Sequence, residues 1–148
     1  MIFDFNKDYI LEDERVILTP LEVKHFDDFL EFSEKKTEIW DYSVLHSDAA
    51  GKENLKDYID FALSCRKKGS EYGFAVFDKL KNKFAGSTRF YNINLDEKSL
   101  EIGYTWYGKE FQGTGLNKHC KYLLLEFAFE KIEIERVGFS ADSDNSKS

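Results

Sequence analysis

Residues 108–131 read GKEFQGTGLNKHCKYLLLEFAFEK, a glycine-rich turn that runs directly into an apolar helical pattern. From residue 116 onward apolar side chains recur at helical spacing, and further ones widen the apolar surface, so we expect this helix to be covered on more than one side. Glycines let main-chain N–H groups converge at a helix N-terminus, where the helix dipole favours negative charge. The stretch therefore predicts an anion-binding turn.

Three short strand patterns precede this turn, at residues 72–77, 84–92 and 100–106. In the third of them every second residue from Leu100 to Trp106 is apolar, and the linkers between the three patterns are short and polar. Strands in such close succession pair most simply with their sequence neighbours. We therefore expect an antiparallel meander that ends at the glycine turn.

The N-terminal part of the chain reads as a short strand followed by a helix. Residues 15–18 favour the strand, and the segment from Thr19 to Glu22 has the pattern of a helix start, with Thr19 as the cap and Pro20 in the first turn. We expect this helix to continue through the apolar positions around Phe29.

A second helix and a last strand complete the expected elements. Apolar residues recur at helical spacing over residues 54–68, and basic residues followed by Gly69 are typical of a helix end. A strand is expected over residues 134–141. The segment between the two N-terminal helices has no clear period and contains aromatic and histidine side chains that could anchor a loop beside a substrate: Trp40, Tyr42 and His46.

Composition indicates one soluble globular domain over residues 1–148. The chain is 42% hydrophobic and 33% charged, with a formal net charge of −7. An acidic balance argues against a nucleic-acid partner, because phosphate neutralisation needs clustered Lys and Arg. No apolar run is long enough to cross a membrane, and the N-terminus lacks the pattern of a signal peptide, so we expect a cytoplasmic protein.

The cysteines and histidines favour structural roles over metal binding. Cys65 and Cys120 both fall in helical patterns, without a second cysteine at metal-ligand spacing, and are expected to be reduced core thiols. His25, His46 and His119 form no motif typical of a zinc or iron site, and His119 is expected to be a solvated polar residue. We therefore expect no metal cofactor.

Three motifs compete for the glycine turn. A dinucleotide fingerprint would need glycine where Lys118 stands, and a P-loop would need lysine where Thr114 follows Gly113. The third motif, [Q/R]-x-x-G-x-[G/A], is met from Gln112 to Leu116 and departs only at its last position, Asn117.

With this motif and with Glu101-Ile102-Gly103-Tyr104 and Trp106 upstream, the sequence resembles the GNAT superfamily of acyl-CoA-dependent N-acetyltransferases from about Arg15 to Ser148. It resembles more closely the branch that includes the ribosomal-protein N-terminal acetyltransferases, in which asparagine at the last motif position is familiar. The resemblance implies an α/β (α+β) fold with a mixed, mostly antiparallel twisted sheet flanked by helices. A C-terminal helix and the last strands of that branch are missing here, so the resemblance also implies either that this chain is shortened or that a partner chain supplies the missing edge.

The resemblance implies acetyl-CoA as cosubstrate and places its binding site. The strand before the turn would carry a bulge that exposes backbone to the pantetheine arm, at Tyr104, Thr105 and Trp106. We expect the side chains of Tyr104 and Trp106 to pack inward. Asn145 would lie near the coenzyme arm. Gln112 would frame the turn, and the main-chain amides that would bind the pyrophosphate belong to Gly113, Thr114, Gly115, Leu116 and Asn117.

The implied activity is direct transfer of an acetyl group to a primary amine of a small molecule or peptide. An ammonium cannot attack a thioester, so a base must take its proton, and Glu101 is the best candidate, ahead of Glu71 and Tyr91. A surface carboxylate without a catalytic role is an equally open reading of Glu101. The alternative function is a non-catalytic acyl-CoA-binding or oligomerising module, and an exposed sheet edge would favour a homodimer. Nucleotide binding through the same turn is a third possibility.

Overall fold

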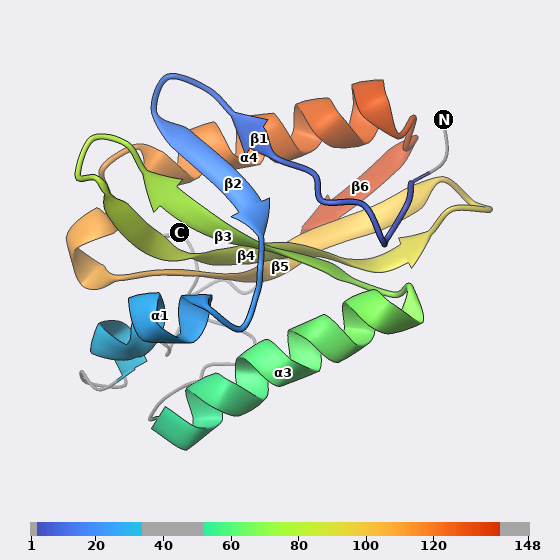
Figure 1. Ribbon diagram of the computed structural model, residues 1–148. Coiled ribbons are helices and arrows are strands. Elements are labelled where there is room, and N and C mark those ends of the chain that lie inside the picture. The colour runs from blue at the N-terminus through green and yellow to red at the C-terminus, as the bar shows by residue number, and fades with distance from the viewer. Residues whose placement is uncertain (1–2, 34–51, 140–148) are drawn as a thin grey trace.

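The computed structural model describes residues 3–33 and 52–139 as one sheet with helices on both faces. The strands are ordered as in the sequence: β1 (Leu11–Glu12), β2 (Val16–Pro20), β3 (Tyr72–Asp78), β4 (Lys83–Asn94), β5 (Ser99–Tyr107) and β6 (Arg136–Phe139). The helices are α1 (His25–Ser33), α3 (Lys52–Lys68) and α4 (Leu116–Glu126), which a π-helical turn extends over Phe127–Lys131. Helices α1 and α3 cover one face of the sheet and α4 covers the other (Figure 1).

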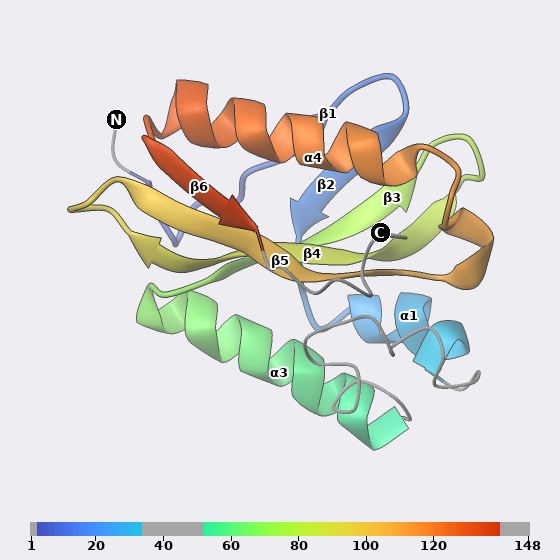
Figure 2. The ribbon, with the colours of Figure 1, turned by 180° about the vertical axis from the view of Figure 1, so that it is seen from behind.

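The expected meander is confirmed as β3, β4 and β5, which pair antiparallel with one another. Strand β6 lies beside β5 at the edge of the described sheet (Figure 2) and runs parallel to it, with Ser99 opposite Arg136 and Ile102 opposite Phe139. A parallel neighbour needs a crossover connection, and α4 supplies it. The mixed, mostly antiparallel sheet flanked by helices is therefore confirmed, and α4 begins where β5 has delivered the glycine turn.

The helix start expected at Thr19 is wrong. Thr19 and Pro20 belong to β2, where they pair with β3, and α1 begins only at His25. The N–H of Glu22 donates to Nδ1 of His25 at 2.9 Å, and burial lowers the pKa of this imidazole, which keeps Nδ1 available as an acceptor. Strand pairing overrides the local capping pattern here. Burying alternate residues of a strand completely stabilises the fold more than starting the helix earlier would.

The side of α4 that faces the sheet supplies much of the core, but its outer side does not. Leu116, Cys120 and Leu124 are at most 1% exposed, whereas Tyr122 and Phe129 are 64% and 46% exposed. The expectation that this helix is covered on more than one side is thus wrong for the described part of the chain. No helix within residues 3–33 and 52–139 is both long and apolar enough to span a bilayer.

Candidate functional site

The turn before α4 has the geometry that its glycines predicted. Gly113 and Gly115 both adopt left-handed backbone conformations, with φ of 72° and 88°, and both are exposed. Gly115 is the N-cap residue of α4, and no side chain caps this helix. The N–H groups of Gly113, Gly115 and Leu116 donate no hydrogen bond to any described residue. Leu116 is buried, whereas the donors of Gly113 and Gly115 are on exposed residues, and exposed main-chain donors at a helix N-terminus are suited to bind an anion.

Hydrogen bonds on the inner side of the turn hold its shape. Nε2 of Gln112 donates to the carbonyl of Tyr107 at 2.9 Å, and Oγ1 of Thr114 donates to the carbonyl of Phe111 at 2.6 Å. The hydroxyl of Tyr107 donates to Oδ1 of Asn117 at 2.8 Å. Gln112 thus ties the turn back to the end of β5, which is the framing contact that the resemblance implied for this side chain.

We expect Tyr107→Phe to lower the free energy of unfolding by about 1 kcal/mol, the typical contribution of one buried hydrogen bond. Tyr107 is 3% exposed, and burial raises its pKa well above the usual range, so the hydroxyl stays protonated and donates to Asn117. Urea unfolding measures the change. The matched control is Tyr122→Phe on the exposed side of α4, which should leave stability unaltered; equal effects of the two changes would contradict the structural role of this bond.

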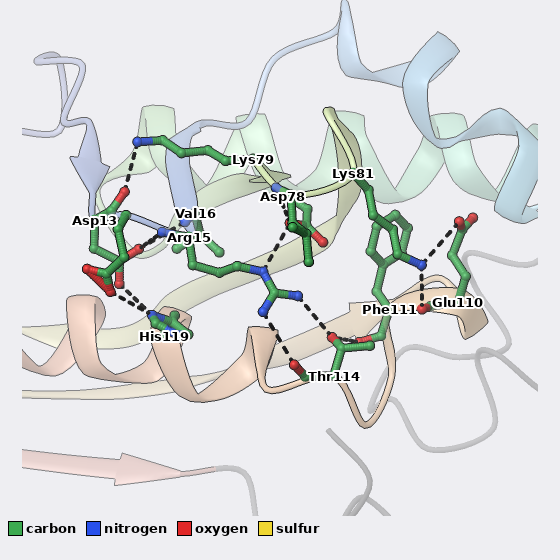
Figure 3. Close-up of polar contacts among 12 residues, drawn as sticks. Asp13, Arg15, Val16, Asp78, Lys79, Lys81, Glu110, Phe111, Thr114 and His119 are labelled. Atoms are coloured by element: carbon green, nitrogen blue, oxygen red, sulfur yellow. Dashed lines mark hydrogen bonds and ion pairs between the residues drawn. The ribbon is translucent and has the colours of Figure 1, made fainter.

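A cationic side chain that the sequence did not reveal also contacts the turn. The guanidinium of Arg15 bonds to buried Asp78 through Nε at 3.1 Å, and its two terminal nitrogens lie 3.4 Å from the carbonyl oxygen and from Oγ1 of Thr114. Figure 3 shows Arg15 lying between these two partners. The resemblance required no cation at this site, and the signal was hidden because these residues are far apart in the sequence.

His119 is not the solvated residue that we expected. Its Nδ1 lies 2.8 Å from Oδ2 of Asp13, and the imidazole is 35% exposed. Asp13, Glu14 and His119 bring their possible ligand atoms within 4.8 Å of one another. Because Nδ1 of His119 is already bonded to Asp13, and Oδ1 of Asp13 accepts from the N–H groups of Arg15 and Val16, the cluster ties the β1–β2 turn to α4 (Figure 3).

Strand β5 contains a bulge at the position where the resemblance implied one. The register with β4 shifts so that Ser87 faces Trp106 while Arg89 faces Gly103, and Tyr104 inside this shift has a φ of 51°. The pairing of β5 with β6 ends at Ile102 in the described residues. From Tyr104 to the glycine turn, β5 therefore has no described pairing partner in β6.

Trp106 packs inward, as the alternation of β5 predicted, and Thr105, which the alternation placed on the other side of the strand, is buried as well. Trp106 is 2% exposed and meets Phe29 edge to face, with ring centroids 4.9 Å apart. Oγ1 of Thr105 lies 2.8 Å from Oγ1 of Thr88 on the neighbouring strand, and both threonines are buried. The side chains of Thr105 and Trp106 are thus not available to a bound molecule.

A buried arginine supports the bulge from the α3 side of the sheet. The side chain of Arg89 is fully buried, and its guanidinium lies 4.6 Å from the ring of Tyr104 and 4.9 Å from the ring of Tyr58. Nη1 of Arg89 donates to Glu71 at 2.6 Å, and the hydroxyl of Tyr58 donates to the carbonyl of Tyr104 at 3.1 Å. The carboxylate of Glu71 is therefore occupied by an ion pair, which makes it a weaker candidate for the base.

Glu101 lies on β5 beside an open cavity of about 360 Å³, which Arg136 and Gly138 of β6 also line. Asn92 donates from Nδ2 to one carboxylate oxygen at 2.5 Å, and the hydroxyl of Tyr91 donates to the other at 3.4 Å. Among the three candidate bases, Glu101, Glu71 and Tyr91, Glu101 combines a half-exposed carboxylate with an open cavity beside it. Asn145 and the loop residues Trp40, Tyr42 and His46 lie outside the described residues.

Comparison with known proteins agrees with this arrangement. Residues 15–148 match the family described as acetyltransferase (GNAT) domain. YdaF of Bacillus subtilis (strain 168), provisionally named a ribosomal N-acetyltransferase, is 36% identical over 63 residues, which make up 43% of this chain and 34% of YdaF. The match therefore spans about a third of that relative's length.

Solved structures extend the likeness to the whole fold. A provisionally assigned acetyltransferase from T. thermophilus is 27% identical with a TM-score of 0.77, covering 99% of this chain and 72% of that one. RimL, a ribosomal L7/L12 α-N-protein acetyltransferase solved with coenzyme A, is 17% identical with a TM-score of 0.75, covering 88% and 73%. The chain spans 59% of a GCN5-related N-acetyltransferase from Brucella melitensis. With the family match over residues 15–148, the glycine turn and the fold lead to one conclusion: the chain belongs to the GNAT acetyltransferase family.

Proposed function

We propose that this chain binds acetyl-CoA at the turn from Gln112 to Asn117 and transfers the acetyl group to a primary amine. The observation that carries the proposal is the N-terminus of α4, where the main-chain N–H groups of the exposed residues Gly113 and Gly115 have no described acceptor. A diphosphate matches such a site in charge and in the number of acceptor oxygens. The complex of RimL with coenzyme A supports this choice of anion for the family.

The β5 edge gives the rest of the cosubstrate a path toward Glu101. An extended strand rises about 3.3 Å per residue, so the six steps from Glu101 to Tyr107 span about 20 Å. The site is therefore elongated, with the anion-binding turn at one end of β5 and the carboxylate at the other. Main-chain groups of the bulged segment from Tyr104 would hold the pantetheine arm between these ends.

The two cysteines argue for direct transfer instead of a covalent acyl-enzyme. Cys65 and Cys120 are the only cysteines in the sequence, and both are buried. Burial raises the pKa of both thiols, that of Cys120 to about 12, and a thiol must ionise to act as a nucleophile. The amine itself would then attack the thioester, and Glu101 would accept the proton that the amine must lose.

Attack on the thioester requires a primary amine, so the candidate acceptors are a protein N-terminus, a polyamine and an aminoglycoside-like compound. The name of YdaF and the RimL structure favour a protein N-terminus among these. A non-catalytic acyl-CoA-binding module is the alternative, since it would use the same turn without turnover. Measuring thiol release from acetyl-CoA in the presence of each amine class distinguishes an acetyltransferase from a non-catalytic module, because an acetyltransferase releases the thiol only with its acceptor.

Coenzyme A should stabilise the protein, whereas ATP and NAD should not. A ligand at 100 times its dissociation constant adds about 2.7 kcal/mol to the free energy of unfolding, which for a chain of this length raises Tm by roughly 5–10 °C. Thermal unfolding with each compound at the same concentration measures this. A shift with ATP or NAD but not with coenzyme A would reject the proposed site; a shift with coenzyme A but no thiol release would favour the non-catalytic module.

A further inference from the structure

The turn between β1 and β2 makes two contacts with the region around the N-terminus of α4. Asp13 bonds to His119 in the helix, and Arg15 bonds to Thr114 in the glycine turn, on either side of the N-cap Gly115. Figure 3 shows the contact of Asp13 with His119 in α4 and the contact of Arg15 with Thr114 in the glycine turn before it. Two attachments from one rigid turn restrict both the translation and the rotation of the helix start.

Arg15 is itself held in place from behind. Asp78 is fully buried, and its Oδ1 accepts from Nε of Arg15 at 3.1 Å and from the N–H of Leu80 at 2.9 Å. A buried carboxylate is stable only when it is paired, so this bond keeps the guanidinium at one position and in one plane. With Nε directed to Asp78, the two terminal nitrogens are directed to Thr114.

The contact with Thr114 determines where the next amide points. The described chain has no cis peptide bond, and in a planar trans peptide group the C=O and the N–H point in opposite directions. Because the carbonyl of Thr114 is directed toward Arg15, the N–H of Gly115 in the same peptide group is directed away from it. That N–H is one of the open donors of the candidate anion site.

We infer that Arg15, held by Asp78, is a positioning residue that orients the Gly115 amide for the diphosphate of the acyl-CoA. The inference rests on the proposed function, since it assumes that this turn binds the cosubstrate. Donors that are already oriented lose less entropy on binding, so the Arg15 contact raises affinity without being part of the chemical step. The role needs the planar fork of arginine, and a positive charge alone does not supply it.

Arg15→Ala and Arg15→Lys should both weaken acetyl-CoA binding by roughly tenfold, the loss expected for one charge-assisted hydrogen bond. Calorimetry measures the dissociation constant, and kcat at saturating acetyl-CoA should stay within about twofold of the wild type. Lys67→Ala on exposed α3 is the control for loss of one positive charge. Arg15→Lys with wild-type affinity would overturn the inference, because a bare charge would then be sufficient.

Arg15 could act by positioning the turn or by attracting the phosphates directly, and Asp78→Asn should change the affinity for acetyl-CoA in opposite directions in the two cases. Removing this negative charge should strengthen binding if Arg15 acts on the phosphates as a free cation. Binding should weaken by several-fold if Asp78 holds the guanidinium for Thr114. Thermal unfolding of the variant checks that it is folded, and the Arg15→Lys result decides the matter if it is not. Tighter binding by Asp78→Asn would refute the positioning role.

Backbone order in the ligand-free protein gives a readout that does not depend on the cosubstrate. The ¹⁵N order parameters of Gly113 and Gly115 should be near the rigid value of about 0.85 in the wild type and fall clearly in Arg15→Ala. Unchanged order parameters would contradict the inference even if coenzyme A binds normally. If the wild type binds no coenzyme A while its turn loosens in Arg15→Ala, the proposed function fails and the mechanical role of Arg15 stands.

Discussion

Gly115→Asp should weaken acetyl-CoA binding by at least about 100-fold while leaving the protein folded. A Cβ at this position meets no atom within 4 Å, so the side chain has room, and the strain of a side chain at the left-handed φ of 88° lowers stability to a similar extent in the Asp and Asn variants. The new carboxylate would accept hydrogen bonds from the same open amides that the proposal assigns to the diphosphate, and it would repel the phosphates. The loss thus combines competition for donors with like-charge repulsion.

The matched control is Gly115→Asn, which has the same shape without the charge. Gly115 has a φ of 88°, and asparagine tolerates left-handed backbone better than most side chains do. We expect this variant to bind roughly tenfold more weakly than the wild type, and the gap between the two variants measures the charge effect alone. Calorimetry with coenzyme A at two salt concentrations tests this. Equal affinities of the two variants would place the phosphates elsewhere.

Much of the fold could be predicted because its elements have strong local periods. The meander strands and α3 lie within a few residues of their expected bounds, and Gly69 ends α3 with a φ of 79° as a glycine stop should. The prediction failed at Thr19, where a good local capping pattern is overruled by pairing with β3. Two-residue β1 carries no periodic signal and was missed.

The candidate site likewise has a part that could be predicted from the sequence and a part that could not. Its turn was predictable because main-chain amides need only glycines and a helix start, which are local features. The contact of Arg15 with Thr114 joins residues 99 positions apart, and the ion pair with Asp78 joins residues 63 apart, so no motif could reveal them. Tyr104 likewise has a left-handed backbone that a tyrosine rarely adopts and that its sequence neighbours do not indicate.

Glu101→Gln should lower kcat by about 100-fold and leave the dissociation constant of acetyl-CoA unchanged, because general-base catalysis typically contributes a factor of this size or more. Glutamine keeps the shape of the side chain and can still accept from Asn92, so the fold should be preserved. Turnover is measured by thiol release with the amine that gives the highest wild-type rate. The control is Glu97→Gln, an exposed carboxylate in the β4–β5 hairpin that bonds to Asn94.

The pH dependence separates a base from a carboxylate that only binds the substrate. The amine must lose a proton before it attacks, so a base matters most at a pH where the amine is still protonated, and the ratio of wild-type to Glu101→Gln rates should be largest there. Alkali deprotonates the amine without help, so this rate ratio should shrink toward high pH. A base therefore predicts a rate ratio that falls as the pH rises through the pKa of the amine. A carboxylate that only attracts a cationic amine predicts instead that Glu101→Gln raises the acceptor KM and leaves kcat intact. That outcome would assign the proton to another base or to a relay through water.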